Sequence, residues 1–109
     1  MSYNVYSTLT FQKSAKRITK KHPSIVTDLR KLIEEISSNP FCGIPLGNDS
    51  YKIRSAITSK GKGKSGGARV ITWLKVVAQN VYLIAVYDKS EKETLTEQEL
   101  SSLLVKSGL

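Results

Sequence analysis

The chain has 109 residues, of which 39% are hydrophobic and 24% charged, so it suits one domain over residues 1–109 and excludes a chain disordered throughout. Its 17 Lys and Arg residues outnumber 9 Asp and Glu residues, and the net charge of +8 favours contact with polyanions. No stretch approaches the roughly 20 apolar residues that span a bilayer, and no secretory signal is visible. With the single cysteine, Cys42, these features indicate a reducing cytoplasm.

Hydrophobic periodicity in the first 38 residues predicts a short strand followed by two helices. Alternation over 3–8 favours the strand, and apolar residues at helical spacing predict a helix over 10–21. Pro23 disfavours helix at the preceding residue and suits the first turn of a new helix. The second helix is predicted over 24–38, and the two helices form a helical hairpin. Its apolar stripe comprises Ile25, Leu29, Leu32, Ile33 and Ile36.

The second half of the chain predicts three antiparallel strands. Residues 39–50 hold two prolines and two glycines and are expected to form a loop. Alternation with a period of two begins at Tyr51 and again at Val70, and the apolar run 81–87 is typical of a central strand. We expect a short turn at 78–80 between the last two strands, with Asn80 in a left-handed conformation.

The last residues predict a capped helix. Thr96 and Glu99 are spaced as a capping box, and Leu95 is placed to contact Leu100 across the helix start. The predicted order is therefore strand, two helices, three antiparallel strands and helix. This order indicates an α+β fold in which an N-terminal strand and a helical hairpin pack on a small antiparallel sheet, with the helices on one face.

Positive charge is concentrated between the predicted strands. Residues 51–75 hold seven basic residues and no acidic residue. Lys52 and Arg54 share one face of a strand because side chains alternate, and Arg69 begins the partner strand, so the three cations are expected to converge on one sheet face. The loop 59–67 joins these strands, and its glycines predict flexibility. It carries three further candidate phosphate-binding residues, Lys60, Lys62 and Lys64.

This basic segment has two interpretations. The lysines of the loop could only keep a solvated hairpin tip from aggregating. The converging flanks favour instead a surface that follows the phosphates of a nucleic acid. Nucleotide-triphosphate binding is not expected, because the loop lacks the spacing of a P-loop and leads into a strand.

Few other side chains suggest chemistry. Trp73 and Tyr87 could stack RNA bases, although Trp73 also suits the core, and Tyr87 is left open. We interpret Cys42 as an ordinary thiol and His22 as a helix-cap or surface residue. No Asp, Glu, His or Cys cluster has metal-ligand spacing, so we expect neither metal nor cofactor. We assign no catalytic role to the late acids.

The motifs from residue 51 to about 100 resemble the RelE superfamily of bacterial toxins from type II toxin–antitoxin systems, and HigB-type toxins most of all. They are "YKIR", the Gly/Lys loop, "GGARVITWL" and "VYLIAVYDKSEKETLTEQEL". The resemblance implies an endonuclease that cleaves messenger RNA in the ribosomal A site, without a cofactor, and is neutralised by a cognate antitoxin. The superfamily also contains ParE-type gyrase poisons.

The resemblance also implies site residues. Lys52, Arg54 and Arg69 match the family's basic positions, and Lys89 falls near the basic residue after the last strand, with Lys92 as the other choice. We take Lys89 as catalytic and Lys92 as RNA-binding. The family's tyrosine near the C-terminus has no match in 95–109, and Tyr87 is left open as its substitute.

Metal-independent RNA cleavage needs positive charge at the phosphate and a proton acceptor for the 2′-hydroxyl. Arg54 and Arg69 are the candidates for the charge, because the guanidinium fork engages two phosphate oxygens. Lys52 is the candidate acceptor, because crowded cations lower the pKa of a lysine. Two alternatives stay open: a gyrase-inhibiting toxin with this fold, and a nucleic-acid-binding module without catalysis.

Overall fold

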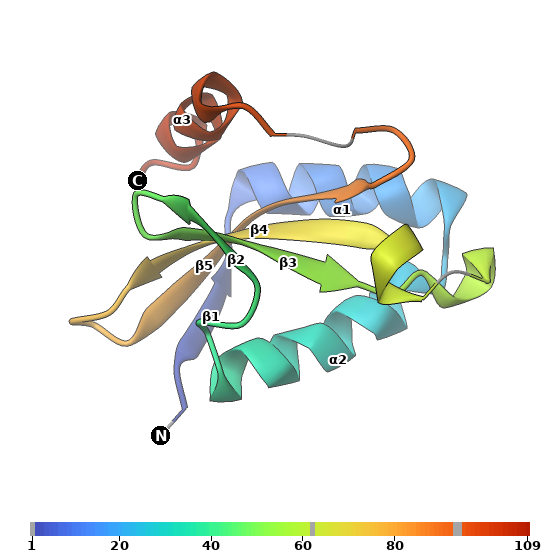
Figure 1. Ribbon diagram of the computed structural model, residues 1–109, viewed down its shortest axis with the longest axis horizontal. Coiled ribbons are helices and arrows are strands. Elements are labelled where there is room, and N and C mark those ends of the chain that lie inside the picture. Colours follow the sequence, from blue (N-terminus) through green and yellow to red (C-terminus); the bar gives the residue numbers. More distant parts are fainter. Residues whose placement is uncertain (1, 62, 93–94) are drawn as a thin grey trace.

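A five-stranded mixed sheet lies at the centre of the computed structural model, which describes residues 2–61, 63–92 and 95–109 (Figure 1). Its strand order is β1-β5-β4-β3-β2, with β1 parallel to β5 and every other neighbouring pair antiparallel. The elements follow one another as β1 (Asn4–Ser7), α1 (Leu9–Lys21), α2 (Ile25–Ser38), β2 (Ile44–Gly47), β3 (Ser50–Ser55), the 3-10 turns η1 (Thr58–Lys60) and η2 (Lys64–Gly66), β4 (Ala68–Lys75), β5 (Asn80–Asp88) and α3 (Glu97–Lys106).

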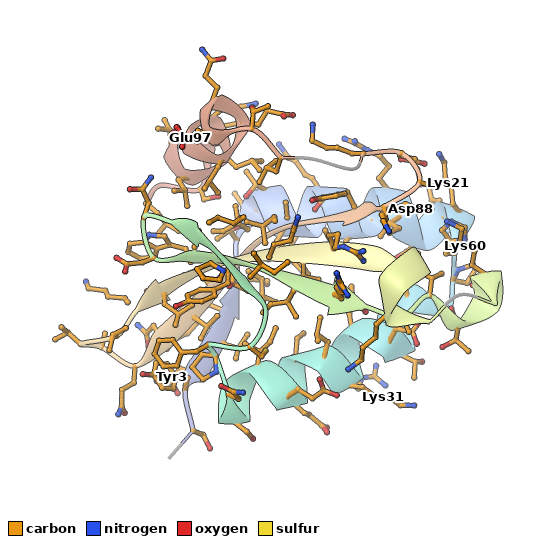
Figure 2. The ribbon with its side chains drawn as sticks, viewed as in Figure 1. Tyr3, Lys21, Lys31, Lys60, Asp88 and Glu97 are labelled. Atoms are coloured by element: carbon orange, nitrogen blue, oxygen red, sulfur yellow. The ribbon has the colours of Figure 1, made fainter. Side chains whose placement is uncertain are left out.

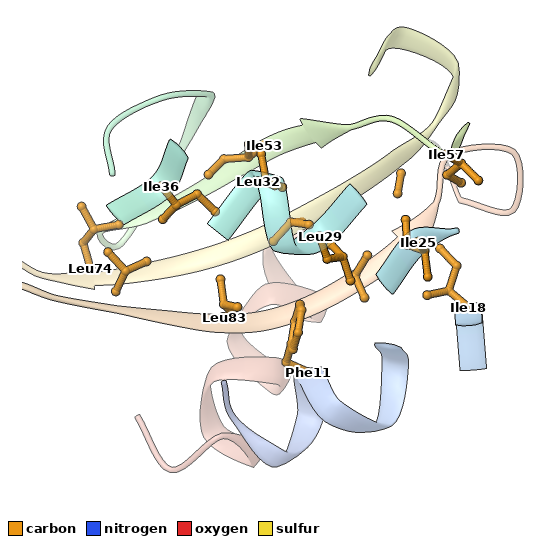
Figure 3. Close-up of a cluster of buried hydrophobic side chains, with 14 residues drawn as sticks. Phe11, Ile18, Ile25, Leu29, Leu32, Ile36, Ile53, Ile57, Leu74 and Leu83 are labelled. Carbon is orange, nitrogen blue, oxygen red and sulfur yellow. The ribbon is translucent and has the colours of Figure 1, made fainter. Parts of the chain in front are cut away.

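The larger core lies between the sheet and the helical hairpin (Figure 3). The apolar stripe of α2 contributes Ile25, Leu29, Leu32 and Ile36, all buried, against Ile53, Val70 and Leu74 of the sheet. The predicted strand and the two predicted helices of the N-terminal part are confirmed within one or two residues at each end. His22 caps the C-terminal end of α1, where its backbone N–H donates to the carbonyl of Ile18 at 2.9 Å.

Helix α3 lies on the opposite face of the sheet, so the expectation that all helices share one face is wrong. Its buried Leu100 belongs to a smaller cluster with Ile71, Ile84 and Ala85. The predicted capping box of Thr96 and Glu99 is present. A bulge in β5 explains how two consecutive residues join this cluster: Ile71 pairs with Ala85 and Thr72 with Leu83, which leaves Ile84 as the extra residue.

Two further sequence expectations are corrected. Residues Ile44–Gly47, expected as loop, form strand β2 at the edge of the sheet, paired antiparallel to β3. Pro45 is tolerated there because an edge strand has no partner for one row of its backbone groups. In the turn between β4 and β5, the left-handed residue is Gln79, with φ 56°, and Asn80 already belongs to β5.

No helix among the described residues is long and apolar enough to cross a membrane.

Gly67 allows the basic loop to approach strand β3 closely. A Cβ atom built on this residue would lie 2.2 Å from the carbonyl oxygen of Ser55 and 3.0 Å from the amide nitrogen of Ile57. Both neighbours are backbone atoms, so neither can move aside by a change of rotamer. The glycine before β4 is therefore required by packing, and it fixes where the strand with Arg69 begins.

We expect Gly67→Ala to lower the free energy of unfolding by about 1–3 kcal/mol, as overpacking does elsewhere, measured by urea denaturation. Gly63→Ala is the matched control, because its added Cβ meets nothing within 4 Å and its φ of −71° suits alanine. Equal losses in the two variants would contradict this account of Gly67.

Candidate active site

The register of β3 and β4 places the three predicted cations on one face of the sheet. Arg54 lies directly opposite Arg69, and Lys52 lies opposite Ile71. Ile71 belongs to the cluster under α3, and side chains alternate along each strand, so all three cations lie on the α3 face. This juxtaposition is the one that the sequence predicts.

The cations differ in how much of each side chain meets solvent. Arg54 is exposed and Lys52 half-buried, whereas Arg69 is only 4% exposed. The Arg69 guanidinium donates from Nη1 to the carbonyl oxygens of Lys64 and Ala68, at 2.9 and 3.0 Å. Burial lowers the pKa of Arg69, and so does the neighbouring charge of Arg54. An approaching ligand therefore meets Arg54 first, with Arg69 behind it as a fixed positive charge.

A hollow of about 310 Å³ lies between α2 and the outer edge of β3, and Glu35 of α2 is part of its lining. Lys52 and Arg54 line it together with Lys64 from η2. Lys64 is exposed, and its ammonium lies 3.7 Å from a carboxylate oxygen of Glu35. The hollow thus gathers cations from the strand and from the loop.

Tyr87 continues the row of Arg54 and Arg69 onto β5, because it lies opposite Arg69 in the register. Its hydroxyl is buried and has no hydrogen-bond partner among the described residues. Burial raises its pKa; Arg69 opposes this effect and Glu99 adds to it. The hydroxyl therefore stays neutral near pH 7 and can both donate and accept. An open groove of about 550 Å³ between α1 and α3 reaches this side chain.

The start of the basic loop is held by hydrogen bonds to two acidic residues. The Asp28 carboxylate accepts from the backbone N–H of Thr58 at 2.9 Å and from its hydroxyl at 2.6 Å. Asp88, 4% exposed, accepts from Lys60 Nζ at 2.8 Å and lies 3.0 Å from Nε2 of His22. Figure 2 shows Lys60 and Asp88 side by side at the end of the sheet. The start of the loop is therefore anchored at Thr58 and at Lys60.

These contacts change the interpretation of Lys60. Its ammonium is already bound to Asp88, and it also donates to the Ser90 hydroxyl at 3.2 Å. Sequence reasoning gave Asp88 no role. The sequence offered one clue to a role for Asp88, which is that it is an acidic residue at the end of an apolar strand in a strongly basic chain. Lys62, another predicted RNA-binding residue, lies outside the described residues.

The remaining predicted residues occupy the border of the site. The backbone N–H of Lys89 donates to the Gly67 carbonyl at 3.0 Å, which carries the β4–β5 pairing past the strand ends. Lys92 contacts Glu99 at the start of α3. Trp73 is half-buried on the α3 face, in contact with the smaller core cluster. Whether these side chains bind RNA stays a prediction.

Among the described residues, no group of three or more His, Cys, Asp and Glu side chains is placed to hold a metal ion. Cys42 is free and half-buried, and burial together with Glu35 raises the pKa of its thiol. The site therefore offers guanidinium, ammonium and phenol groups, which suit binding and proton transfer at a phosphate.

Comparison with known proteins agrees with the fold. A mutant of the E. coli toxin RelE in the free state aligns over 100% of both chains, with a TM-score of 0.64 and 21% identity. The isolated E. coli RelE toxin aligns over 99% of this chain and 100% of its own, with a TM-score of 0.56 and 20% identity. These structures share the α+β fold of this chain.

The sequence itself matches the family model of the RelE toxin of the RelE/RelB toxin–antitoxin system over residues 3–107. The chain therefore belongs to the RelE family of toxins from toxin–antitoxin systems.

We expect Asp88→Asn to lower the free energy of unfolding by about 3 kcal/mol at pH 7, because it leaves the partners of a buried anion uncompensated. Burial alone would raise the pKa of Asp88, but hydrogen bonds from Lys60 and Ser90 hold it well below its ordinary value. Stability from such a group is complete above the unfolded pKa of about 3.9 and is lost as pH falls through the folded pKa. The difference between variant and parent should therefore shrink below about pH 4.

Urea denaturation at several pH values measures this effect. Asp49→Asn is the matched control, because Asp49 is exposed and its left-handed φ of 61° suits asparagine. A loss of stability for Asp88→Asn that is the same at pH 3 and pH 7 would show that the charge of Asp88 is not what stabilises the fold.

Proposed function

We propose that this protein is an endoribonuclease that inhibits translation by cleaving messenger RNA at the ribosome, by metal-independent attack of the 2′-hydroxyl. The observation that carries the proposal is the direct opposition of Arg54 and Arg69 on the α3 face, beside Lys52 and Tyr87. Membership of the RelE family supports it.

Two like charges in directly opposed positions destabilise a sheet unless a counter-charge joins them. Among the described residues, Arg54 forms no ion pair with a carboxylate. A phosphodiester would supply that negative charge to Arg54 and accept paired hydrogen bonds from its guanidinium. Arg54 is exposed and binds the phosphate directly, while the buried Arg69 contributes positive electrostatic potential.

The reaction follows from these positions. Lys52 accepts the proton of the 2′-hydroxyl, and the 2′-oxygen forms a bond to phosphorus. The bond from phosphorus to the 5′-oxygen breaks, and the Tyr87 hydroxyl hydrogen-bonds to the departing oxygen. That oxygen takes up a proton from water, and the hydroxide so formed recovers the proton held by Lys52. The products are a 2′,3′-cyclic phosphate and a 5′-hydroxyl end. Arg54, Arg69 and Lys89 stabilise the charge that develops on the phosphate.

The same proposal includes the partners. A ribosome in the cytoplasm presents messenger RNA single-stranded in its A site, and this is the form of RNA that an open basic surface reads. An unrestrained nuclease of this kind would stop growth, so an antitoxin encoded beside this gene completes the system.

We expect Arg54→Ala to slow messenger RNA cleavage by about 10²–10³-fold, the usual loss when one group that stabilises developing charge is removed. The measurement is primer extension on transcripts in a reconstituted translation reaction. Lys75→Ala is the control, because Lys75 is an exposed cation at the other end of β4. Equal cleavage by Arg54→Ala and the parent would overturn the proposal.

The same reaction tests the alternatives. Cuts within codons support the nuclease. An SOS response in cells that keep intact messenger RNA would identify a gyrase-inhibiting toxin, and RNA binding without cuts would identify a non-catalytic module.

For Lys52 we expect a loss of rate when the side chain can no longer accept a proton. Arginine keeps the positive charge but cannot lose its proton in a protein, so Lys52→Arg should slow cleavage by about 10²–10⁴-fold, the usual contribution of a positioned proton acceptor. Single-turnover rates measure this. A rate equal to that of the parent would remove Lys52 from the role of proton acceptor.

A further inference from the structure

Three aromatic side chains form a continuous row across the sheet. Tyr6 of β1 pairs in register with Tyr82 of β5, which pairs with Trp73 of β4. The ring centroids of Tyr6 and Tyr82 lie 5.6 Å apart with planes at 26°, and those of Trp73 and Tyr82 lie 5.7 Å apart at 44°. The row joins strands from opposite ends of the chain.

The aromatic row lies on the same face as the candidate active site. Trp73 and Tyr82 contact the core cluster under α3, and Ile71 of that cluster lies between Trp73 and Arg69 along β4. Trp73 lies four positions along β4 from Arg69, a span of about 13 Å at about 3.3 Å per strand residue. A short run of nucleotides covers that span, so one strand of RNA can contact the cations and the aromatic row together.

The exposure of Tyr6 argues against a purely structural role for the row. Tyr6 is 48% exposed although it lies on a short edge strand, where a polar residue would serve equally well in water. Its ring stacks on Tyr82, and Tyr82 is itself only half-buried. The register continues the row to Ser50 of β3, so these four cross-strand positions carry no charge. A neutral flat ligand suits such a surface better than a phosphate does.

We infer that the aromatic row of Tyr6, Tyr82 and Trp73 stacks unpaired bases of the RNA whose phosphate is held at Arg54. The inference rests on the proposed function, because it describes how the same RNA substrate is bound at nucleotides beyond the cleaved phosphate. Base–aromatic stacking tolerates any base, so the row adds affinity and orients the strand without setting a sequence preference.

Trp73 is the only tryptophan in the chain, so its fluorescence reports directly on the row. The probe is a six-nucleotide RNA with 2′-O-methyl groups, which cannot be cut by 2′-hydroxyl attack, compared with an abasic oligomer of the same length and charge. We expect the base-bearing probe to quench Trp73 emission and the abasic probe to bind without comparable quenching.

The variant Tyr6→Leu should weaken binding of the base-bearing probe about tenfold and leave binding of the abasic probe unchanged. Phe41→Leu is the matched control, since Phe41 is 49% exposed and stacks edge-on with Tyr3, away from the row. Urea denaturation of both variants shows that each remains folded.

The inference is overturned by no quenching by the base-bearing probe, by equal quenching by both probes, or by unchanged affinity in Tyr6→Leu. Quenching by an antitoxin peptide, with none by RNA, would assign the row to a protein partner instead and overturns it as well. These results are separate from a failure of the proposed function, which would appear as unchanged binding of both probes in Arg54→Ala.

Discussion

The register between β3 and β4 is the constraint on which the site depends. Ile53 and Val70 point into the core under α2, and because side chains alternate, their neighbours Arg54 and Arg69 must point to the other face. A slip by one residue would bury both arginines among apolar side chains. Burial of the hydrophobic face therefore holds two like charges together, which their mutual repulsion alone would not allow.

Two acids near the site are engaged on the core side of the sheet. Asp88 lies on the α1 and α2 face of β5, where it binds Lys60 and the ring of His22. Asp28 is engaged by Thr58 at the start of the loop. These two acids fix the loop from the core side. Gly67 lets the end of the loop approach β3 closely. The carbonyl of Lys64 accepts a hydrogen bond from the guanidinium of Arg69. The open face keeps Arg54 exposed to a ligand.

Local pattern was enough to predict the helices, four of the strands and the shared face of Lys52, Arg54 and Arg69, since alternation and helical spacing are properties of neighbouring residues. It failed where distant contacts decide. The segment around Pro45 was expected to be a loop, so the edge strand β2 was missed. The apolar face of α3 does not indicate which side of the sheet the helix covers. The partner of Lys60 lies 28 residues away, at Asp88. The aromatic row depends on the parallel pairing of β1 with β5, which joins the two ends of the chain.

The most direct test of the account follows the arginine side chains by NMR while an uncleavable single-stranded RNA is added. The chain has four arginines, Arg17, Arg30, Arg54 and Arg69, so each guanidinium signal can be assigned. The account predicts that the signals of Arg54 and Arg69 shift together, with little change at Arg17 and Arg30. Shifts at the helical arginines, with Arg54 and Arg69 unmoved, would contradict it.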